Sequence, residues 1–338
     1  MVWDASEITN DPTMPFLDRT LDRIEVQRQF QHHLSSLGRC KDIEIQSIRP
    51  IRYKPERRCL IEYDVVVKPQ KNAPPEVMTL MGKVRAKGLD LHSYQLVKSL
   101  WSAGFSADSE DYISVPEPIG TIPDFQMWLQ RKVPGVVSTE LLGRSGGIDL
   151  ARRIVDAAHK LHQANIPSHR IHSLTDELNI LHALLPKLFK MHPQWKERLK
   201  RILKASEELG AAIPTSKTTG IHRDFYPDQV LVDGSRLYLL DLDLYCQGDP
   251  ALDIGNFIAH ITEQSLRTLG SPDALVDREA AMEQRLVELR GETIRAAVRA
   301  YNTLTLVRHI YISTIFPERS PFTESLIELC EKRLKITE

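Results

Sequence analysis

Hydrophobic and polar residues alternate in three segments of the first hundred residues. Glu62 and Asp64, for example, alternate with the apolar residues of the segment from Ile61 to Val67. Alternation of this kind predicts half-buried strands. The three predicted strands cover residues 43–47, 61–67 and 77–84.

Other segments of the same region have different patterns. An amphipathic stretch over 21–34, followed by Gly38 as a C-cap, predicts a helix before the first strand. The polar, proline-rich segment 68–76 is expected to be a hairpin loop. A second helix is predicted over 90–103, because apolar residues recur there at spacings of three and four. Two further strands are expected at 113–115 and 125–130, and Pro134-Gly135 ends the strand-rich part.

Beyond Pro134 the pattern becomes mainly helical. One apolar stripe contains Leu150, Ile154, Ala158 and Leu161. Further helices are predicted over 175–190, 194–210, 253–267, 278–303 and 323–335. One interruption is strand-like: residues 230–232 and 237–240 flank Asp233-Gly234, which is a strong hairpin signal.

This order predicts an α+β chain with two lobes. A small, sheet-rich N-lobe is followed by a hinge near residues 130–135 and a larger helical C-lobe. We divide the chain into an N-terminal helical extension (1–39), an N-lobe (40–132) and a helical C-lobe (133–338).

Composition limits the classes of function. The 338 residues include 44 Lys+Arg and 45 Asp+Glu, and this balance argues against nucleic acid as a partner. Every apolar run is too short for a transmembrane helix, and the polar N-terminus does not resemble a signal peptide. The four cysteines are scattered, which favours free thiols in a reducing compartment. We therefore expect a cytoplasmic protein without a membrane partner, and leave its oligomeric state open.

The most informative segment covers residues 221–257. Asp224 lies just before the first strand of the predicted hairpin, and Asp241 just after the second, so both carboxylates emerge at the same end. Gln229 stands at the start of the first strand. Two carboxylates and an amide oxygen together could hold a hard cation such as Mg²⁺, or one carboxylate could accept a hydroxyl proton. The alternative is a pair of solvated loop carboxylates.

The sequence HRDFYPDQ (222–229) resembles the catalytic loop H-x-D-x-x-x-x-N of protein-kinase-like phosphotransferases. A strand that ends before Asp241 and the sequence GDPALD at 248–253 resemble the aminoglycoside phosphotransferase and choline-kinase-like branch, the phosphotransferase enzyme family. The predicted order of elements over 40–260 also fits. The resemblance implies a protein-kinase-like bilobal fold, in which an antiparallel-sheet N-lobe binds ATP and a helical C-lobe holds the catalytic loop and the acceptor site.

The resemblance also implies roles for single residues of the C-lobe. Asp224 would be the catalytic base that orients the acceptor hydroxyl. Asp241 and Gln229 would bind Mg²⁺, with Gln229 standing where the family usually has asparagine. His222 would hold the loop, and Asp253 would support it by accepting hydrogen bonds from backbone N–H groups.

In the N-lobe, the resemblance implies that Lys83 binds the nucleotide phosphates. The helix over 90–103 has no glutamate to pair with it, and Gln95 is the nearest substitute by position. The phosphate-covering loop expected at 47–59 has no glycine, so side-chain cations would replace its backbone amides, unless this charge run is simply a solvated face. Those cations are Arg52, Lys54, Arg57 and Arg58. The hinge from Gln130 to Val133 would meet the adenine edge.

These features together predict an ATP-dependent phosphotransferase that acts on a hydroxyl of a small molecule, with Mg²⁺ as cofactor. Tyr226 stands where protein kinases carry lysine, which favours a non-protein acceptor. Residues 262–338 carry 11 basic and 12 acidic residues, so nothing in this balance favours a polycationic aminoglycoside over a sugar or an amino alcohol. The alternative hypothesis is a non-catalytic nucleotide-binding or regulatory module of the same fold.

Overall fold

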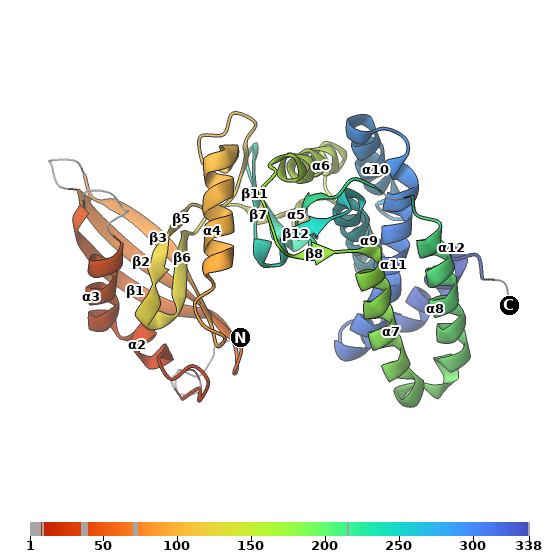
Figure 1. Ribbon diagram of the computed structural model, residues 1–338, viewed down its shortest axis with the longest axis horizontal. Helices are drawn as coiled ribbons and strands as arrows, with labels where there is room; N and C mark the ends of the chain where they lie inside the picture. The colour runs from red at the N-terminus through yellow and green to blue at the C-terminus, as the bar shows by residue number, and fades with distance from the viewer. Residues whose placement is uncertain (1–7, 9, 35–39, 70–73, 215, 337–338) are drawn as a thin grey trace. The chain divides into compact units, whose positions relative to one another are not determined.

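A computed structural model of the chain describes residues 8, 10–34, 40–69, 74–214 and 216–336. The chain divides into two compact units, Met1–Pro134 and Gly135–Glu338. The first unit is built on an antiparallel sheet and the second is mainly helical (Figure 1). Among the described residues, no helix is both long and apolar enough to cross a bilayer.

The sheet of the first unit has the strand order β1-β2-β3-β6-β5. Its strands are β1 (Cys40–Lys54), β2 (Arg58–Pro69), β3 (Glu76–Arg85), β5 (Pro118–Ile122) and β6 (Met127–Arg131). The prediction of a loop over 47–59 was wrong, because β1 and β2 extend to a short turn at residues 55–57. The alternation continues through this segment: Tyr53 and Cys59 are buried, while the charged residues between them face the other way.

One face of this sheet is covered by the helices α2 (Leu17–Leu21) and α3 (Arg23–His33), as Figure 1 shows. Phe30 of α3 packs edge-on against Tyr63 of β2, with ring centroids 5.0 Å apart. The helix predicted over 21–34 is α3, and the short helix α2 immediately before it was not predicted. Asp22 separates them, and its side chain accepts a hydrogen bond from the backbone N–H of Glu25 and so caps α3. The predicted cap at Gly38 lies outside the described residues.

The rest of the first unit contains α4 (Leu91–Leu100), which begins after Asp90, and a π-helical turn (Trp101–Phe105). The strand expected at 113–115 is β4 (Ile113–Ser114), and the one expected at 125–130 is β6. The strand β5 was not predicted, because its sequence PIGTI contains proline and glycine, which are uncommon in strands.

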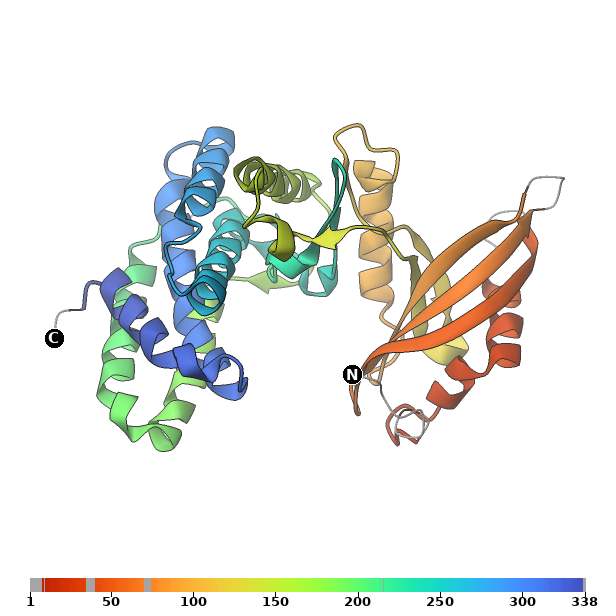
Figure 2. The same ribbon diagram turned by 180° about the vertical axis from the view of Figure 1, so that it is seen from behind.

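Eight helices, found among the described residues, build most of the second unit (Figure 2). They are α5 (Ser138–Leu141), α6 (Gly147–Gln163), α7 (Leu174–Met191), α8 (Lys196–Ala211), α9 (Pro250–Leu269), α10 (Val276–Arg290), α11 (Ile294–Ile315) and α12 (Thr323–Arg333). The long helices α9 and α11 pack side by side. The prediction of one helix over 278–303 was wrong, since Gly291, with φ of 89°, ends α10 and a new helix follows.

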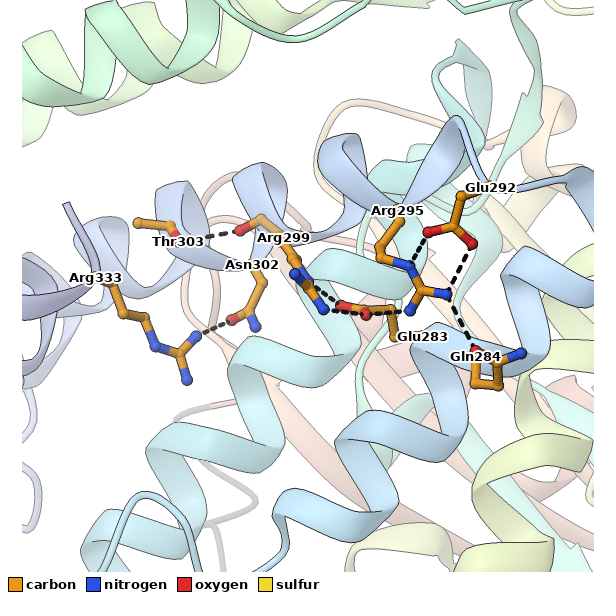
Figure 3. Close-up of polar contacts among 8 residues, drawn as sticks. All are labelled: Glu283, Gln284, Glu292, Arg295, Arg299, Asn302, Thr303 and Arg333. Atoms are coloured by element: carbon orange, nitrogen blue, oxygen red, sulfur yellow. Dashed lines mark hydrogen bonds and ion pairs between the residues drawn. The ribbon is translucent and has the colours of Figure 1, made fainter. Parts of the chain in front are cut away.

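Ion pairs fix α11 between its neighbours, as the close-up in Figure 3 shows. The carboxylate of Glu283 on α10 accepts hydrogen bonds from Arg299 at 2.8 Å and from Arg295 at 2.6 Å, both on α11. On the other side, Arg333 of α12 donates to Asn302 of α11 at 2.8 Å. A carboxylate shared by two guanidinium groups holds the α10–α11 pair more firmly than a single exposed ion pair would.

Candidate active site

The hairpin predicted around residue 233 is present in the second unit. It consists of β10 (Val230–Asp233) and β11 (Arg236–Leu239), paired antiparallel from Val230↔Leu239 to Asp233↔Arg236. The turn therefore contains Gly234 and Ser235, one residue later than expected. Gly234 has φ of 55°, a left-handed conformation that glycine adopts without strain.

The open end of this hairpin brings two predicted site residues close in the fold. The backbone N–H of Leu240 donates to the carbonyl oxygen of Gln229 at 2.9 Å, directly beyond the last strand pair. Asp241 follows Leu240 and adopts a left-handed conformation with φ of 50°. A non-glycine residue held in this conformation is strained, and such strain is concentrated at functional sites.

The loop before the hairpin, residues 222–229, is held by one buried carboxylate. Oδ2 of Asp253 accepts a hydrogen bond from the backbone N–H of His222 at 2.9 Å, and Oδ1 accepts one from Arg223 at 2.8 Å. The same carboxylate lies 2.8 Å from Nε2 of His162 on α6. These bonds stabilise Arg223 in its left-handed conformation (φ of 70°), immediately before Asp224.

His222 joins this loop to the hairpin. Its Nε2 atom lies 2.8 Å from the carbonyl oxygen of Leu240, the residue that precedes Asp241. Leu240 is thus bound by His222, which precedes Asp224, and by Gln229, which follows it. These two hydrogen bonds fix the loop to the hairpin. The side chains of Asp224 and Asp241 are both partly exposed at this end of the second unit.

A second group of polar residues, on α9 and α11, also holds the loop in place. Nδ2 of Asn256 on α9 donates to the carbonyl oxygen of Phe225 at 2.8 Å, and Arg308 of α11 donates to the amide oxygen of Asn256 at 2.6 Å. Arg308 also lies 3.4 Å from Glu177. Burial would raise the pKa of Glu177, but the hydrogen bond with His172 and the charge of Arg308 outweigh it and lower that pKa.

The donor chemistry at the hairpin end fits a hard cation. Gln229 is 7% exposed and offers an amide oxygen, and Asp241 offers a carboxylate. Mg²⁺ is usually held by one or two protein carboxylates, with phosphate and water oxygens completing its shell. Within the described ranges of the chain, no three His, Cys, Asp or Glu side chains gather into a metal-binding cluster. A resident all-protein site of that type is thus not found in this part of the chain.

In the first unit, the face of the sheet opposite α2 and α3 carries several of the predicted nucleotide residues. Strand register aligns Arg52, Leu60, Lys83 and Trp128 in one row across β1, β2, β3 and β6. Residues paired in this way point to the same face. Gln130 lies two positions beyond Trp128 and so shares that face, whereas Val133 follows the end of β6.

The ammonium group of Lys83 lies 4.7 Å from the centre of the Trp128 ring, a cation–π contact. Tyr94 of α4 lies on the same ring, with centroids 6.2 Å apart. Gln95, the substitute suggested for a glutamate partner, is exposed. An aromatic face thus contacts Lys83 in this chain, and Trp128 is a site residue that the sequence analysis missed.

The basic residues gather near the β1–β2 turn. Burial and the neighbouring charges of Arg58, Arg52 and Arg57 lower the pKa of Lys54. Arg49 differs from them, because it pairs with Asp64 at 2.6 Å and with Glu62 at 3.2 Å. The turn is a concentration of positive charge that an anion such as phosphate would offset.

The turn itself is anchored by the N-terminal segment. Oδ2 of Asp11 accepts hydrogen bonds from the backbone N–H of Glu56 and from the Tyr53 hydroxyl, both at 2.8 Å. Glu56 occupies the left-handed position of the turn, with φ of 57°, where a glycine would be unstrained. The backbone N–H of Glu56, at the tip of this turn, is therefore bound to Asp11. The basic side chains of the turn are left as the groups that can contact an anion there.

Comparison with known proteins agrees with this arrangement. Residues 100–292 match the family described as the phosphotransferase enzyme family. The chain belongs to this family. No curated protein matches the chain.

Solved structures similar to this phosphotransferase include a choline/ethanolamine kinase family protein from Mesorhizobium loti, with a TM-score of 0.57 and 14% identity over 94% of this chain and 96% of the other. A complex of aminoglycoside phosphotransferase APH(4)-Ia with AMP-PNP and hygromycin B has a TM-score of 0.57 and 13% identity over 92% and 97%. A glucosamine kinase has a TM-score of 0.51 and 14% identity over 88% and 78%. The phosphotransferase therefore has the expected α+β protein-kinase-like fold.

Several supporting residues of the phosphotransferase were not predicted. His162, Asn256 and Arg308 lie in helices and contact the catalytic loop or its supports. His162 had a visible signal, because it stands four positions after Ala158 on an otherwise apolar helical stripe. A histidine on such a face needs a buried partner, and Asp253 is that partner.

Proposed function

We propose that this phosphotransferase transfers the γ-phosphate of ATP to a hydroxyl group of a small molecule and requires Mg²⁺. One observation carries the proposal: Asp253 and His222 fix the catalytic loop to the hairpin, so that Asp224, Gln229 and Asp241 emerge at one end of the second unit. Phosphoryl transfer works mainly by positioning the reactants and stabilising charge. It therefore requires fixed oxygen ligands, here Asp241 and Gln229, and a carboxylate that can act as the base, here Asp224.

Each predicted residue then has a chemical task. Asp224 accepts the proton of the acceptor hydroxyl as that oxygen attacks the γ-phosphorus. Asp241 and Gln229 would hold Mg²⁺, which when bound offsets the negative charge of the phosphate oxygens.

The first unit supplies groups for the nucleotide. Lys83 binds the phosphates, and the basic turn residues Arg52, Lys54 and Arg57 add positive charge to them. The segment from Gln130 to Val133 offers backbone groups to the adenine edge. The hydrogen bond between Asp11 and the turn supports this assignment, since it keeps the turn, and with it the basic side chains, in one conformation.

The short segment between Asp241 and α9 supports a small acceptor. After Asp241 come only a 3₁₀ turn (Leu242–Leu244) and the short strand β12 (Cys246–Gly248) before α9 begins. Protein kinases place a long, peptide-binding segment at this point, and here there is no length for one. The names of the similar proteins, a choline/ethanolamine kinase family protein, an aminoglycoside phosphotransferase and a glucosamine kinase, also refer to small molecules with hydroxyl groups.

The proposal is tested with the purified chain, ATP, Mg²⁺ and a panel of small hydroxyl compounds, with ADP release as the readout. Asp224→Asn and Asp241→Asn should each lower kcat at least about 10³-fold. The matched control is Asp233→Asn, an exposed aspartate next to the hairpin turn, which should keep wild-type turnover. Equal turnover in the wild type and in Asp224→Asn would reject the assigned base. ATP binding without turnover of any acceptor would favour the non-catalytic module.

A further inference from the structure

A cleft in the second unit lies directly beside Asp224. Its volume is about 310 Å³, which is at the lower end of the range for small-molecule sites. It is lined by the catalytic loop and by α5, α9, α11 and the segment after α11. A compound in this cleft can present a hydroxyl group to Asp224, so its lining decides which acceptors fit.

One wall of the cleft is a series of rings. Tyr226 stacks on His260 with centroids 4.8 Å apart, and His260 meets His309 edge-on at 4.4 Å. His309 is 1% exposed, and among the described residues neither of its ring nitrogens has a hydrogen-bond partner. A buried polar ring without partners is costly, unless a ligand supplies them.

Both histidines are uncharged at neutral pH. Burial and the charges of Arg308 and Arg319 lower the pKa of His260 to about 3. Burial, His260 and the nearby arginines lower the pKa of His309 well below its usual value. A neutral imidazole offers one donor and one acceptor, which is also what a hydroxyl group offers. The arginine contributions further mean that guanidinium groups add positive electrostatic potential at these rings.

The source of that potential is visible in the cleft. Arg267 and Arg319 both line it, and the one carboxylate of α9 at this point, Glu263, is shared between them. Nε of Arg267 lies 3.2 Å from Oε1 of Glu263, and Nη1 of Arg319 lies 3.9 Å from the same atom. Glu263 is 6% exposed, so this carboxylate is enclosed behind the guanidinium groups. At this part of the cleft two fixed cations face one buried anion, so positive charge is concentrated there, whereas Asp224 and Asp228 bring negative charge to the part formed by the catalytic loop.

We propose that the cleft binds a small hydroxyl compound that carries one anionic group, a carboxylate or a phosphate. Arg319 and Arg267 bind the anionic group, His260 and His309 bind hydroxyl groups, and Asp224 receives the hydroxyl to be phosphorylated. A cationic substituent in the place of this anionic group would lie against the two guanidinium groups and bind poorly. This inference rests on the proposed function, since it uses Asp224 as the base.

The experiment uses glucose and derivatives that each differ from it in a single substituent. Glucuronate and glucose 6-phosphate carry an anion, glucose is neutral, and glucosamine is a cation. The rate of ADP release gives kcat/KM for each compound, and ligand-observed NMR with the full-length chain gives binding independently of turnover. We expect at least a tenfold preference for one anionic compound over glucose, and the weakest binding for glucosamine. The two anionic arms distinguish a carboxylate from a phosphate.

Variants locate the effect. Arg319→Gln and Arg267→Gln should remove the anionic preference, mainly through KM. Arg299→Gln is the matched control, because Arg299 lies on α11 but pairs with Glu283 outside the cleft. An anionic compound that neither reacts nor binds better than glucose overturns the inference. Turnover of glucose or glucosamine in that case would leave the proposed function intact, so the two failures are distinguishable.

Discussion

At the scale of single residues, Asp253 satisfies two backbone N–H groups of the catalytic loop and faces His162. We predict that Asp253→Asn lowers the free energy of unfolding by about 2–3 kcal/mol, because a neutral amide offers one oxygen in place of two and leaves a buried donor unpaired. It should also lower kcat, because the loop that positions Asp224 loses its support. Urea unfolding and turnover measure the two effects, and a variant as stable as Asp233→Asn would contradict the prediction.

Asp11 should make the stability of the chain depend on pH. Burial would raise the pKa of Asp11, but hydrogen bonds from Glu56, Thr13 and Tyr53 outweigh it and lower that pKa to about 2. The ordinary value in an unfolded chain is about 3.9. The stabilisation is therefore complete above about pH 4 and is lost as the pH falls toward 2.

The test compares the wild type with Asp11→Asn by urea unfolding between pH 7 and pH 3. We expect a difference of about 1–2 kcal/mol at pH 7 that narrows below pH 4. Asp108→Asn, at an exposed loop position, should match the wild type throughout. A difference that stays constant as the pH falls would show that the carboxylate charge of Asp11 is not responsible.

The residues of the site differ in how far the sequence could predict them. Asp224, Gln229 and Asp241 flank a hairpin whose own sequence indicates the turn, so their placement follows from local rules. His162 and Arg308 contact the supports of the loop, Asp253 and Asn256, from helices that are far away along the chain, and no local pattern indicates these partners. The ring contact between Lys83 and Trp128 depends on the register of β3 and β6, which is likewise not local.

At the scale of elements, the packing of α9 on α11 depends on Gly255. A Cβ atom at this position would lie 2.6 Å from Cβ of Tyr301 and 2.8 Å from the backbone nitrogen of Asn302. Backbone atoms of α11 cannot move aside cheaply, so we predict that Gly255→Ala destabilises the chain by about 1–3 kcal/mol despite the better helix propensity of alanine.

The same change should weaken acceptor binding, because α9 carries His260 and α11 carries His309. The measurements are urea unfolding and KM for the acceptor. Gly143→Ala is the control, since a Cβ atom there meets no other atom within 4 Å. If Gly255→Ala is as stable as this control, α9 and α11 can move apart enough to admit a methyl group, and the prediction is wrong.

The elements also show where pattern reasoning is limited. The strands β1, β2, β3 and β6 and the helices α7, α8, α9 and α12 follow their hydrophobic periods, and their existence was predicted. Charged residues on the outer face of β1 and β2 made the 47–59 segment resemble a loop, although its inward positions are apolar. In 278–303, apolar residues on both sides of Gly291 continue a helical period through a break that only the backbone conformation reveals.

At the scale of the whole molecule, the proposed function needs both units, since Lys83 belongs to the first and Asp241 to the second. ATP with Mg²⁺ should therefore stabilise the full chain, by about 2.7 kcal/mol at a concentration of 100 times Kd. We predict that Lys83→Met and Asp241→Asn each remove most of this stabilisation, and that EDTA removes the part that depends on the metal.

Thermal unfolding with and without ATP measures this stabilisation. Lys87→Met is the control for the first unit, because Lys87 is exposed beyond the end of β3, and Asp233→Asn is the control for the second. Both controls should retain the wild-type shift. Loss in only one of the two test variants would assign nucleotide binding to that unit alone, and an undiminished shift in both would remove Lys83 and Asp241 from the nucleotide site. This measurement reports ATP binding without any acceptor. It therefore distinguishes a chain that does not bind ATP from one that binds ATP but has not been given its acceptor.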